Sequence, residues 1–140
     1  DINISDFARE LVDAVSESFK QPEQDVLLNY NMDNIKMNIN QAVPLSLLLN
    51  ECIVNCYKHA FAGRDNGEID IDLGMNGDKV NIQVADNGNG LPDGFDFEKP
   101  QSLGVTLIRT LVSQLRGEAH YSSNGHGTRF SFEFTLEEVS

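Results

Sequence analysis

The sequence predicts an α+β domain in which helices pack against a sheet as a two-layer sandwich. Apolar residues recur at helical spacing in three segments, and strand-like stretches come in pairs between these segments. The chain has 140 residues, the length of one domain, and contains no repeat or linker that would divide it. Paired strands separated by helices in one short chain favour this architecture.

The first part of the chain is expected to hold a helix and two short strands. Apolar residues recur at helical spacing from Ser5 onward, and this helix should end before Pro22. Two short apolar segments, 26–30 and 36–39, are strand candidates with a turn at 33–34 between them.

A long helix and a hairpin should follow. Residues 41–61 are apolar around most of a helix, and Pro44 is tolerated because we place it in the first turn. Polar and apolar residues then alternate over 68–73 and again over 80–84, on either side of a turn at 76–77. This alternation predicts a sheet with one buried face and one exposed face.

The last part should contain a loop, a helix and a second hairpin. Residues 87–102 are rich in glycine and proline and are expected to form a loop. The segment 102–116 has an apolar stripe at helical spacing, and Gly117 should close that helix. The hairpin pairs 118–122 with 128–136, and three aromatic residues should form its inward face: Phe130, Phe132 and Phe134.

The charge balance limits the partners. Ten Lys and Arg residues stand against 22 Asp and Glu residues, which gives a net charge of −12. Nucleic acid and anionic membranes need a basic surface, so we expect neither as a partner. No apolar run approaches the ~18 residues of a membrane span, so a membrane would be reached only through segments outside this chain. A small anionic ligand needs only local help from a helix N-terminus, backbone N–H groups, a metal ion or placed cations.

A polar stripe interrupts the long apolar helix. Glu51, Asn55 and Lys58 are spaced i, i+4 and i+7, within roughly 60° of one another on an α-helix, and His59 lies at the edge. Burying an acid, an amide and a cation together would cost several kcal/mol without partners. The stripe is therefore either a surface network or the wall of a polar ligand site, with oxygens for a metal ion and an ammonium for phosphate.

The end of the predicted strand at 80–86 carries a second polar motif. Asp86 is followed by Gly88 and Gly90, which let a backbone turn sharply and approach a ligand closely. A carboxylate accepts hydrogen bonds, so Asp86 suits a donor such as an exocyclic amine, although such turns are also common without a ligand. A calcium loop is excluded, because the third ligand position counted from Asp86 is a glycine.

Two further motifs are weak on their own. Ser102, Leu103 and Gly104 open a predicted helix, where backbone N–H groups approach an anion at the positive end of the helix dipole. Thr128 offers a hydroxyl at the start of the last strand.

Two cysteines, Cys52 and Cys56, lie one helical turn apart in the apolar helix. This placement is typical of small buried hydrophobes in a reducing compartment. His59 could join them on the same face, but no second cluster of ligands appears elsewhere to complete a metal site.

The motifs together resemble the N, G1, G2 and final glycine–threonine boxes of the GHKL ATP-binding family, which includes the catalytic domains of sensor histidine kinases, Hsp90, gyrase B and MutL. The matching motifs, in order, are Glu51-x-x-x-Asn55-x-x-Lys58, Asp86-x-Gly88-x-Gly90, Leu103-Gly104 and Gly127-Thr128. The segments around these boxes are similar to the histidine-kinase group related to the HWE kinases. Two features depart from the pattern: Ser102 occupies a G2 position that is often glycine, and the chain has no tryptophan for a W-x-E signature.

This resemblance implies the Bergerat fold, a mixed sheet covered on one face by three helices, with ATP between the long helix and the lid loop. Asp86 would accept a hydrogen bond from the adenine amino group, and Thr128 would support that contact through water. Gly88 and Gly90 would give the nucleotide room. Asn55 would ligate Mg²⁺ through its amide oxygen.

The resemblance also implies how the phosphates are held and attacked. Lys58 and His59 would meet phosphate oxygens, and the helix start at Ser102, Leu103 and Gly104 would cradle them. Glu51 would either orient a magnesium-bound water or act as a general base. Lys58 would share the catalytic work, which is mostly positioning and charge neutralisation of the γ-phosphoryl group.

The implied function is a histidine kinase catalytic domain, residues 1–140, cut from a longer cytoplasmic chain of a two-component system. The three histidines, His59, His120 and His126, do not lie on a predicted dimerising helical hairpin. We therefore expect the piece to bind Mg-ATP without phosphorylating itself, and to need a separate phosphoacceptor and dimerisation domain and a response regulator. The alternatives are an anti-sigma-type serine kinase and a degenerate nucleotide-binding scaffold; an ATPase like Hsp90, gyrase B or MutL would need a further transducer domain.

Overall fold

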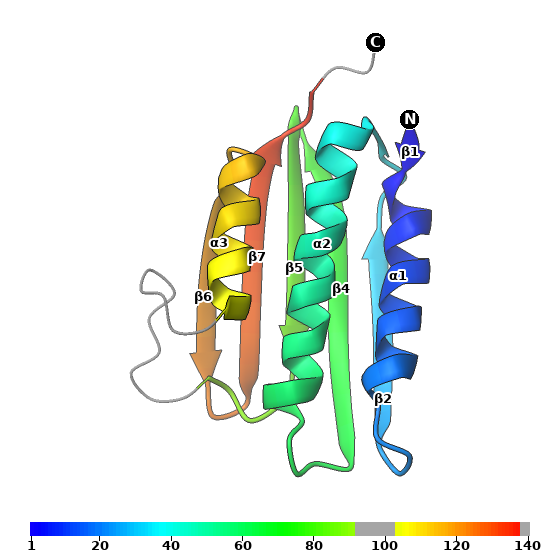
Figure 1. The fold of residues 1–140 in the computed structure, drawn as a ribbon, viewed down its shortest axis with the longest axis vertical. Coiled ribbons are helices and arrows are strands. Elements are labelled where there is room, and N and C mark those ends of the chain that lie inside the picture. Colours follow the sequence, from blue (N-terminus) through cyan, green and yellow to red (C-terminus); the bar gives the residue numbers. More distant parts are fainter. Residues whose placement is uncertain (92–102, 138–140) are drawn as a thin grey trace.

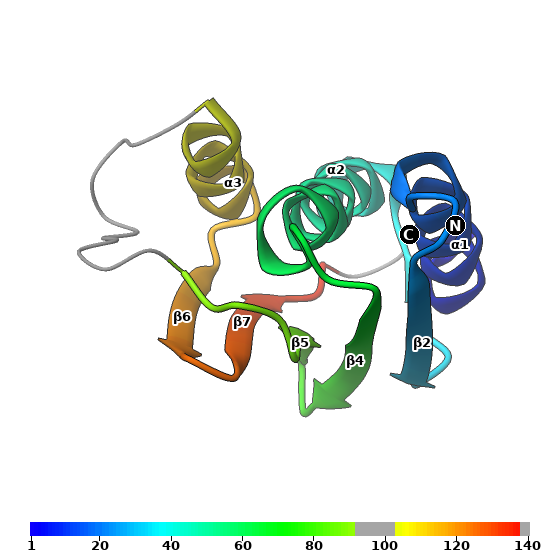
Figure 2. The same ribbon diagram turned by 90° about the horizontal axis from the view of Figure 1, so that it is seen from below.

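Three α-helices cover one face of a five-stranded sheet in the computed structural model, which describes residues 1–91 and 103–137 (Figures 1 and 2). Seen end on, the helices form one layer and the strands the other (Figure 2). The elements along the chain are β1 (Ile2–Asn3), α1 (Ile4–Phe19), β2 (Asp25–Met32), β3 (Lys36–Met37), α2 (Ile39–Asn55), the π-helix η1 (Cys56–Ala60), β4 (Asn66–Asn76), β5 (Lys79–Asp86), α3 (Leu103–Gln114), β6 (Glu118–Asn124) and β7 (Gly127–Thr135). The two-layer α+β architecture predicted from the sequence is confirmed.

The main sheet is mixed, with the strand order β2-β4-β5-β7-β6. β2 runs parallel to β4, and every other neighbouring pair in this sheet is antiparallel. Both predicted hairpins, β4–β5 and β6–β7, are present. The ladder between β5 and β7 joins one hairpin to the other. That ladder places the end of β5 directly beside the start of β7, with Asp86 opposite Thr128.

The two strands predicted near the amino terminus do not pair with each other. β2 lies along the edge of β4 over eight residues, from Asp25 opposite Asn66 to Met32 opposite Leu73. β3 instead pairs with β1 in a separate two-stranded sheet, with Ile2 opposite Met37. Nothing in the sequence indicated the pairing of β2 with β4, because parallel pairing joins segments that are far apart in the chain.

The core lies between the helices and the inward face of the sheet. Alternate residues of β4, β5 and β7 are buried against α2, as the period-2 pattern predicted. The three phenylalanines of β7 form a continuous row, with ring centroids 6.5 Å apart between Phe130 and Phe132 and 5.4 Å apart between Phe132 and Phe134. Each large apolar side chain buried here stabilises the fold by about 1.5–3 kcal/mol.

Two helix boundaries differ from those predicted. α2 begins at Ile39, because the Asn38 side chain caps it by accepting a hydrogen bond from the Gln41 N–H at 3.1 Å. Pro44 therefore lies inside the helix rather than in its first turn. At the end of α3 the residue with a left-handed backbone is Arg116 (φ 54°) rather than Gly117.

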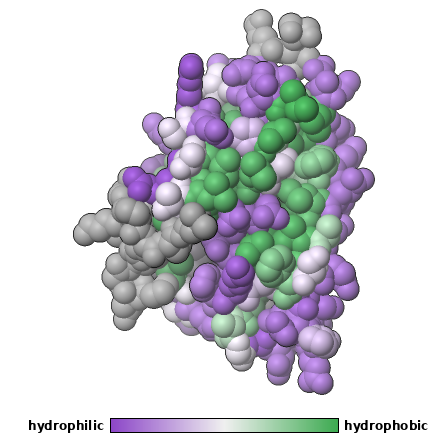
Figure 3. Space-filling view, in the orientation of Figure 1, coloured by the Kyte–Doolittle hydropathy of each residue, from purple (hydrophilic) through white to green (hydrophobic). Residues whose placement is uncertain are grey.

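The helix side of the molecule also shows apolar side chains at its surface (Figure 3). Ile39, Val43 and Leu47 are exposed along one stripe of α2, at spacings of four residues. Among the described residues, no helix has the length and apolar character that crossing a membrane requires.

Candidate functional site

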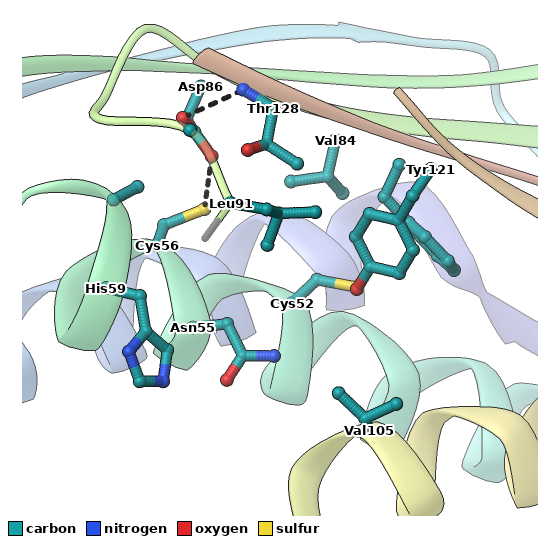
Figure 4. A pocket seen from close by; sticks show the side chains of 13 residues that line it. Cys52, Asn55, Cys56, His59, Val84, Asp86, Leu91, Val105, Tyr121 and Thr128 are labelled. Carbon is teal, nitrogen blue, oxygen red and sulfur yellow. Dashed lines mark hydrogen bonds between the residues drawn. The ribbon is translucent and has the colours of Figure 1, made fainter. Parts of the chain in front are cut away.

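A cavity of about 250 Å³ lies between the carboxyl-terminal end of α2 with η1, the sheet and α3 (Figure 4). Polar side chains enter it from two sides: Asp86 and Thr128 from the sheet, and Asn55 and His59 from the helix. The remaining lining is mostly apolar: Cys52, Cys56, Ala60, Val84, Gly90, Leu91, Val105, Tyr121 and Phe130. The fold therefore brings together four of the polar residues singled out in the sequence.

The Asp86 carboxylate is fixed at the base of the cavity by three donors. Its Oδ1 accepts hydrogen bonds from the backbone N–H groups of Gly88 (2.9 Å) and Thr128 (3.3 Å). Its Oδ2 accepts one from the thiol of Cys56, with a sulfur–oxygen distance of 3.6 Å. Burial raises the pKa of Asp86 above its ordinary value, and the hydrogen bonds from Gly88, Thr128 and Cys56 partly offset that rise.

The loop after β5 is packed tightly against the protein itself. A Cβ atom at Gly88 would collide with the backbone carbonyl of Ala60, and one at Gly90 (φ 80°) would collide with the carbonyl of Asn124. The Asn89 N–H donates to the Ala60 carbonyl at 2.8 Å. Both glycines are therefore required for this packing. From the sequence they were expected instead to give room to a nucleotide. Gly90 also lines the cavity, whereas Gly88 does not.

The π-helix changes which side chains share a face. In η1 the Phe61 N–H bonds to the carbonyl of Cys56, five residues earlier, so each residue turns the chain less than in an α-helix. His59 consequently lines the cavity beside Asn55. Lys58 is turned toward α1, where its Nζ lies 5.9 Å from the centre of the Phe19 ring. The predicted Glu51–Asn55–Lys58 stripe assumed α-helical geometry throughout; in the structure Lys58 does not line the cavity, and its role toward phosphate stays a prediction.

Other predicted site residues lie at the margin of the cavity or outside the described part. Glu51 is half-buried, one turn before Asn55, and does not line the cavity. Ser102 falls outside the described residues. Leu103 and Gly104 are the first two residues of α3, and their role toward a ligand stays a prediction.

The apolar lining includes residues that the sequence interpretation did not place in a site. Cys52 and Cys56 are buried, as predicted, yet both border the cavity. Burial raises the pKa of each thiol well above its ordinary value, so both carry their protons at neutral pH. Tyr121 reaches the same cavity from β6 (Figure 4). The only sequence signal for the two cysteines is their nearness to Asn55, three residues before it and one residue after it, and no sequence pattern indicated Tyr121.

This arrangement suits a flat apolar group that carries a hydrogen-bond donor. Apolar side chains from the sheet and the helix form the walls, and a carboxylate with an oxygen left to accept lies at the base. The Asn55 amide makes no hydrogen bond within the described residues, so its oxygen is available to a cation.

Residues 40–138 match the profile of the family described as "Histidine kinase-, DNA gyrase B-, and HSP90-like ATPase". A "Blue-light-activated histidine kinase 2" of Erythrobacter litoralis is 27% identical over 114 residues, which are 81% of this chain and 33% of that protein. A "Serine-protein kinase RsbW" of Listeria monocytogenes is 39% identical over 90 residues, covering 51% of this chain and 55% of that protein. The chain thus spans about a third of the first relative and about half of the second.

A solved structure shares the fold over nearly the whole chain. The histidine kinase domain of the blue-light-activated kinase EL346 from Erythrobacter litoralis superposes with a TM-score of 0.89 at 24% identity. The alignment covers 96% of this chain and 62% of that one. The mixed sheet under three helices is therefore the fold of a histidine kinase catalytic domain.

Proposed function

The chain belongs to the family of histidine kinase-, DNA gyrase B- and HSP90-like ATPases, and from this we propose that it binds Mg-ATP and transfers the γ-phosphoryl group to a histidine on a separate phosphoacceptor domain. The observation that carries the proposal is the Asp86 carboxylate, held by three donors at the base of an otherwise apolar cavity. Membership in this family implies an ATP site, and the cavity is the place in the described structure that suits a purine.

At the base of the cavity, Asp86 would accept a hydrogen bond from the amino group of adenine. Guanine presents a carbonyl at the equivalent position, which would face the carboxylate without a proton between them. Leaving two buried acceptors unpaired costs about 1–3 kcal/mol or more, so the site should select adenine. Thr128 would support the base through its hydroxyl, which lies 3.2 Å from the Ser123 hydroxyl.

At the mouth of the cavity, Asn55 and His59 would meet the phosphates. Mg²⁺ is usually coordinated by one or two protein oxygens together with phosphate oxygens and water. The amide oxygen of Asn55, which has no hydrogen-bond partner among the described residues, could be one of these ligands. A bound Mg²⁺ would neutralise charge on the phosphates. Lys58 would have to leave the Phe19 ring to reach them, and the helix start at Leu103 and Gly104 would offer its backbone N–H groups.

Glu51 is the candidate for proton transfer or for orienting a magnesium-bound water. It lies one helical turn before Asn55 and makes no side-chain hydrogen bond within the described residues. It is therefore available to a group that enters with the ligand. Most of the catalytic work would still be positioning and charge neutralisation of the γ-phosphoryl group, in which Lys58 would take part.

The acceptor would be supplied by another domain of a longer cytoplasmic protein, with a response regulator as the next recipient. His59 lines the cavity, His120 is in β6 and His126 lies in the β6–β7 turn. His120 and His126 are not on a helix, and His59 is in η1 inside the site itself, so these three histidines are not on a dimerising helical hairpin that could present an acceptor imidazole. The similarity to a histidine kinase of which this chain covers only 33% supports a separate acceptor.

A serine kinase is the second candidate, because the 39% identity to a serine-protein kinase covers half of this chain. The two functions differ in the product. Phosphohistidine is lost in acid and survives in base, whereas phosphoserine behaves in the opposite way.

The test is to incubate the full-length protein with radiolabelled Mg-ATP and to treat the labelled product with acid and with base. We expect label on the protein that acid removes. Acid-stable label would favour the serine kinase, and binding of ATP with no labelled product would favour a nucleotide-binding scaffold.

A further inference from the structure

The two oxygens of the Asp86 carboxylate have different amounts of acceptor capacity left. Each oxygen of an ionised carboxylate offers about two acceptor positions. Both positions of Oδ1 are taken, by the N–H groups of Gly88 and Thr128. On Oδ2 one position is taken by the Cys56 thiol and one remains. A donor on a ligand in the cavity must therefore bond to Oδ2, beside the thiol.

The Cys56 side chain is held where its thiol meets this oxygen. It is 5% exposed, it is the first residue of η1, and its carbonyl accepts the five-residue hydrogen bond from the Phe61 N–H at 2.9 Å. Cys52, one turn earlier, is equally buried and borders the same cavity, but within the described residues it makes no contact of this kind with Asp86. The two thiols thus share an environment and differ in one hydrogen bond.

We propose that Cys56 is a positioning residue for purine recognition, whose thiol fixes Oδ2 of Asp86 so that its last acceptor position faces the amino group of the base. This inference rests on the proposed ATP site and adds to it a residue that does not itself bond to the nucleotide. Both backbone donors bond to Oδ1, so without the thiol only these two bonds resist rotation of the carboxylate about its side-chain torsion, and Oδ2 loses its own donor. The apolar walls of the cavity cannot replace the missing donor.

A role in positioning predicts an effect that depends on the amino group. If Cys56 only filled space, its truncation would weaken every purine nucleotide by the same factor, because all of them fill the cavity alike. If it orients Oδ2, truncation weakens nucleotides that carry the amino group and spares those that lack it. A hydrogen bond to a charged partner corresponds to roughly tenfold in affinity.

The experiment measures binding of two magnesium nucleotides by calorimetry: ATP, and purine riboside triphosphate, which lacks the exocyclic amino group. We expect Cys56→Ala to weaken ATP about tenfold and the analogue by less than about twofold. Cys52→Ala is the matched control, because it removes the neighbouring sulfur from the same cavity, and it should change both nucleotides by the same factor. Cys56→Ser restores a donor and should keep the preference for ATP within about threefold of the wild type.

The outcomes separate this inference from the proposed function. If the wild type binds neither nucleotide, the proposed function is wrong. If the wild type prefers ATP and Cys56→Ala leaves that preference unchanged, only the positioning role is wrong. Thermal unfolding without ligand checks that each variant folds, and if Cys56→Ala does not, Cys56→Val fills the space without a donor and carries the same expectation.

Discussion

The two ends of the cavity are built differently. At the end that would hold adenine, Asp86 is bonded to Gly88, Thr128 and Cys56, and the loop behind it is locked to neighbouring backbone. At the end that would hold phosphate, the side chains of Asn55 and His59 have no hydrogen-bond partner within the described residues. The base end is thus held by hydrogen bonds within the protein, whereas Asn55 and His59 at the phosphate end are free to bond to a ligand or a cation.

This difference predicts that substitutions at the base end affect folding and binding together, whereas those at the phosphate end affect binding alone. The first end is part of the sheet, because Asp86 and Thr128 are opposite each other in the β5–β7 ladder. The second end is a helix terminus followed by a π-helix. The following substitutions test this contrast, from the largest expected effect to the smallest.

Gly90→Ala should break the base end. The backbone of Gly90 is left-handed and the added methyl group would collide with the Asn124 carbonyl, so the loop must move. We expect a loss of about 3 kcal/mol in the free energy of unfolding, together with at least a tenfold loss of ATP affinity. Gly77→Ala is the control, because Gly77 has a similar φ with open space around it, and it should cost only about 1 kcal/mol with ATP binding intact. Equal losses in denaturant titrations of the two variants would contradict this account.

Asn55→Ala should affect only the phosphate end. We expect the affinity for Mg-ATP to fall about tenfold, because a ligand of the cation is lost. The free energy of unfolding without ligand should stay within about 0.5 kcal/mol of the wild type, since no hydrogen bond to the amide is broken. Repeating the titration in a chelator is the internal control: without Mg²⁺ the two proteins should bind ATP equally, and a persistent difference would place Asn55 in another role.

Lys58→Ala should reduce nucleotide affinity less than Asn55→Ala does, and only for nucleotides that carry phosphates. Its ammonium group lies over the exposed edge of α1, where a cation–π contact contributes about 0.5–1 kcal/mol. If Lys58 leaves Phe19 to meet the nucleotide, the variant should weaken ATP about threefold to fivefold and leave adenosine unchanged. Phe19→Leu frees the lysine and should tighten ATP slightly. Equal effects on ATP and adenosine would show that Lys58 does not reach the phosphates.

The pH dependence should reveal the burial of Asp86. Because its pKa is higher in the folded than in the unfolded state, the folded domain binds more protons between the ordinary Asp value and the raised value. In that window the free energy of unfolding without ligand falls as the pH rises, and Asp86→Asn should abolish this contribution. ATP binding should change in the opposite direction, weakening as the pH falls through the raised pKa, because the protonated carboxyl loses acceptor capacity. Chemical denaturation and calorimetry across this range measure both slopes, and parallel slopes would contradict the assignment.

The sequence predicted the parts of the fold that depend on local pattern. Alternation marked β4, β5 and β7 with their buried faces, and helical spacing marked α1, α2 and α3. It did not predict that β2 lies beside β4, since a parallel pair leaves no turn signal between its strands. The helix that contains Pro44 was predicted to start two residues too late, because the cap at Asn38 is a single residue in a polar stretch.

In the cavity, the sequence motifs pointed to residues whose place is set by the end of a helix or strand. Asp86, Asn55 and Thr128 are at the ends of regular elements, so their placement followed from the elements. Lys58 lies away from the cavity because the chain forms a π-helix there, which apolar periodicity does not predict. The contact between Cys56 and Asp86 joins residues 30 positions apart and required the folded structure.

The central claim is that Asp86 recognises the amino group of adenine, and calorimetric titration of the wild type and Asp86→Asn with Mg-ATP and Mg-GTP tests it most directly. The account predicts that the wild type binds Mg-ATP at least tenfold more tightly than Mg-GTP, and that Asp86→Asn, while still folded, loses about a hundredfold in ATP affinity. Binding of both nucleotides with equal affinity, or binding of ATP that Asp86→Asn leaves unchanged, would contradict it.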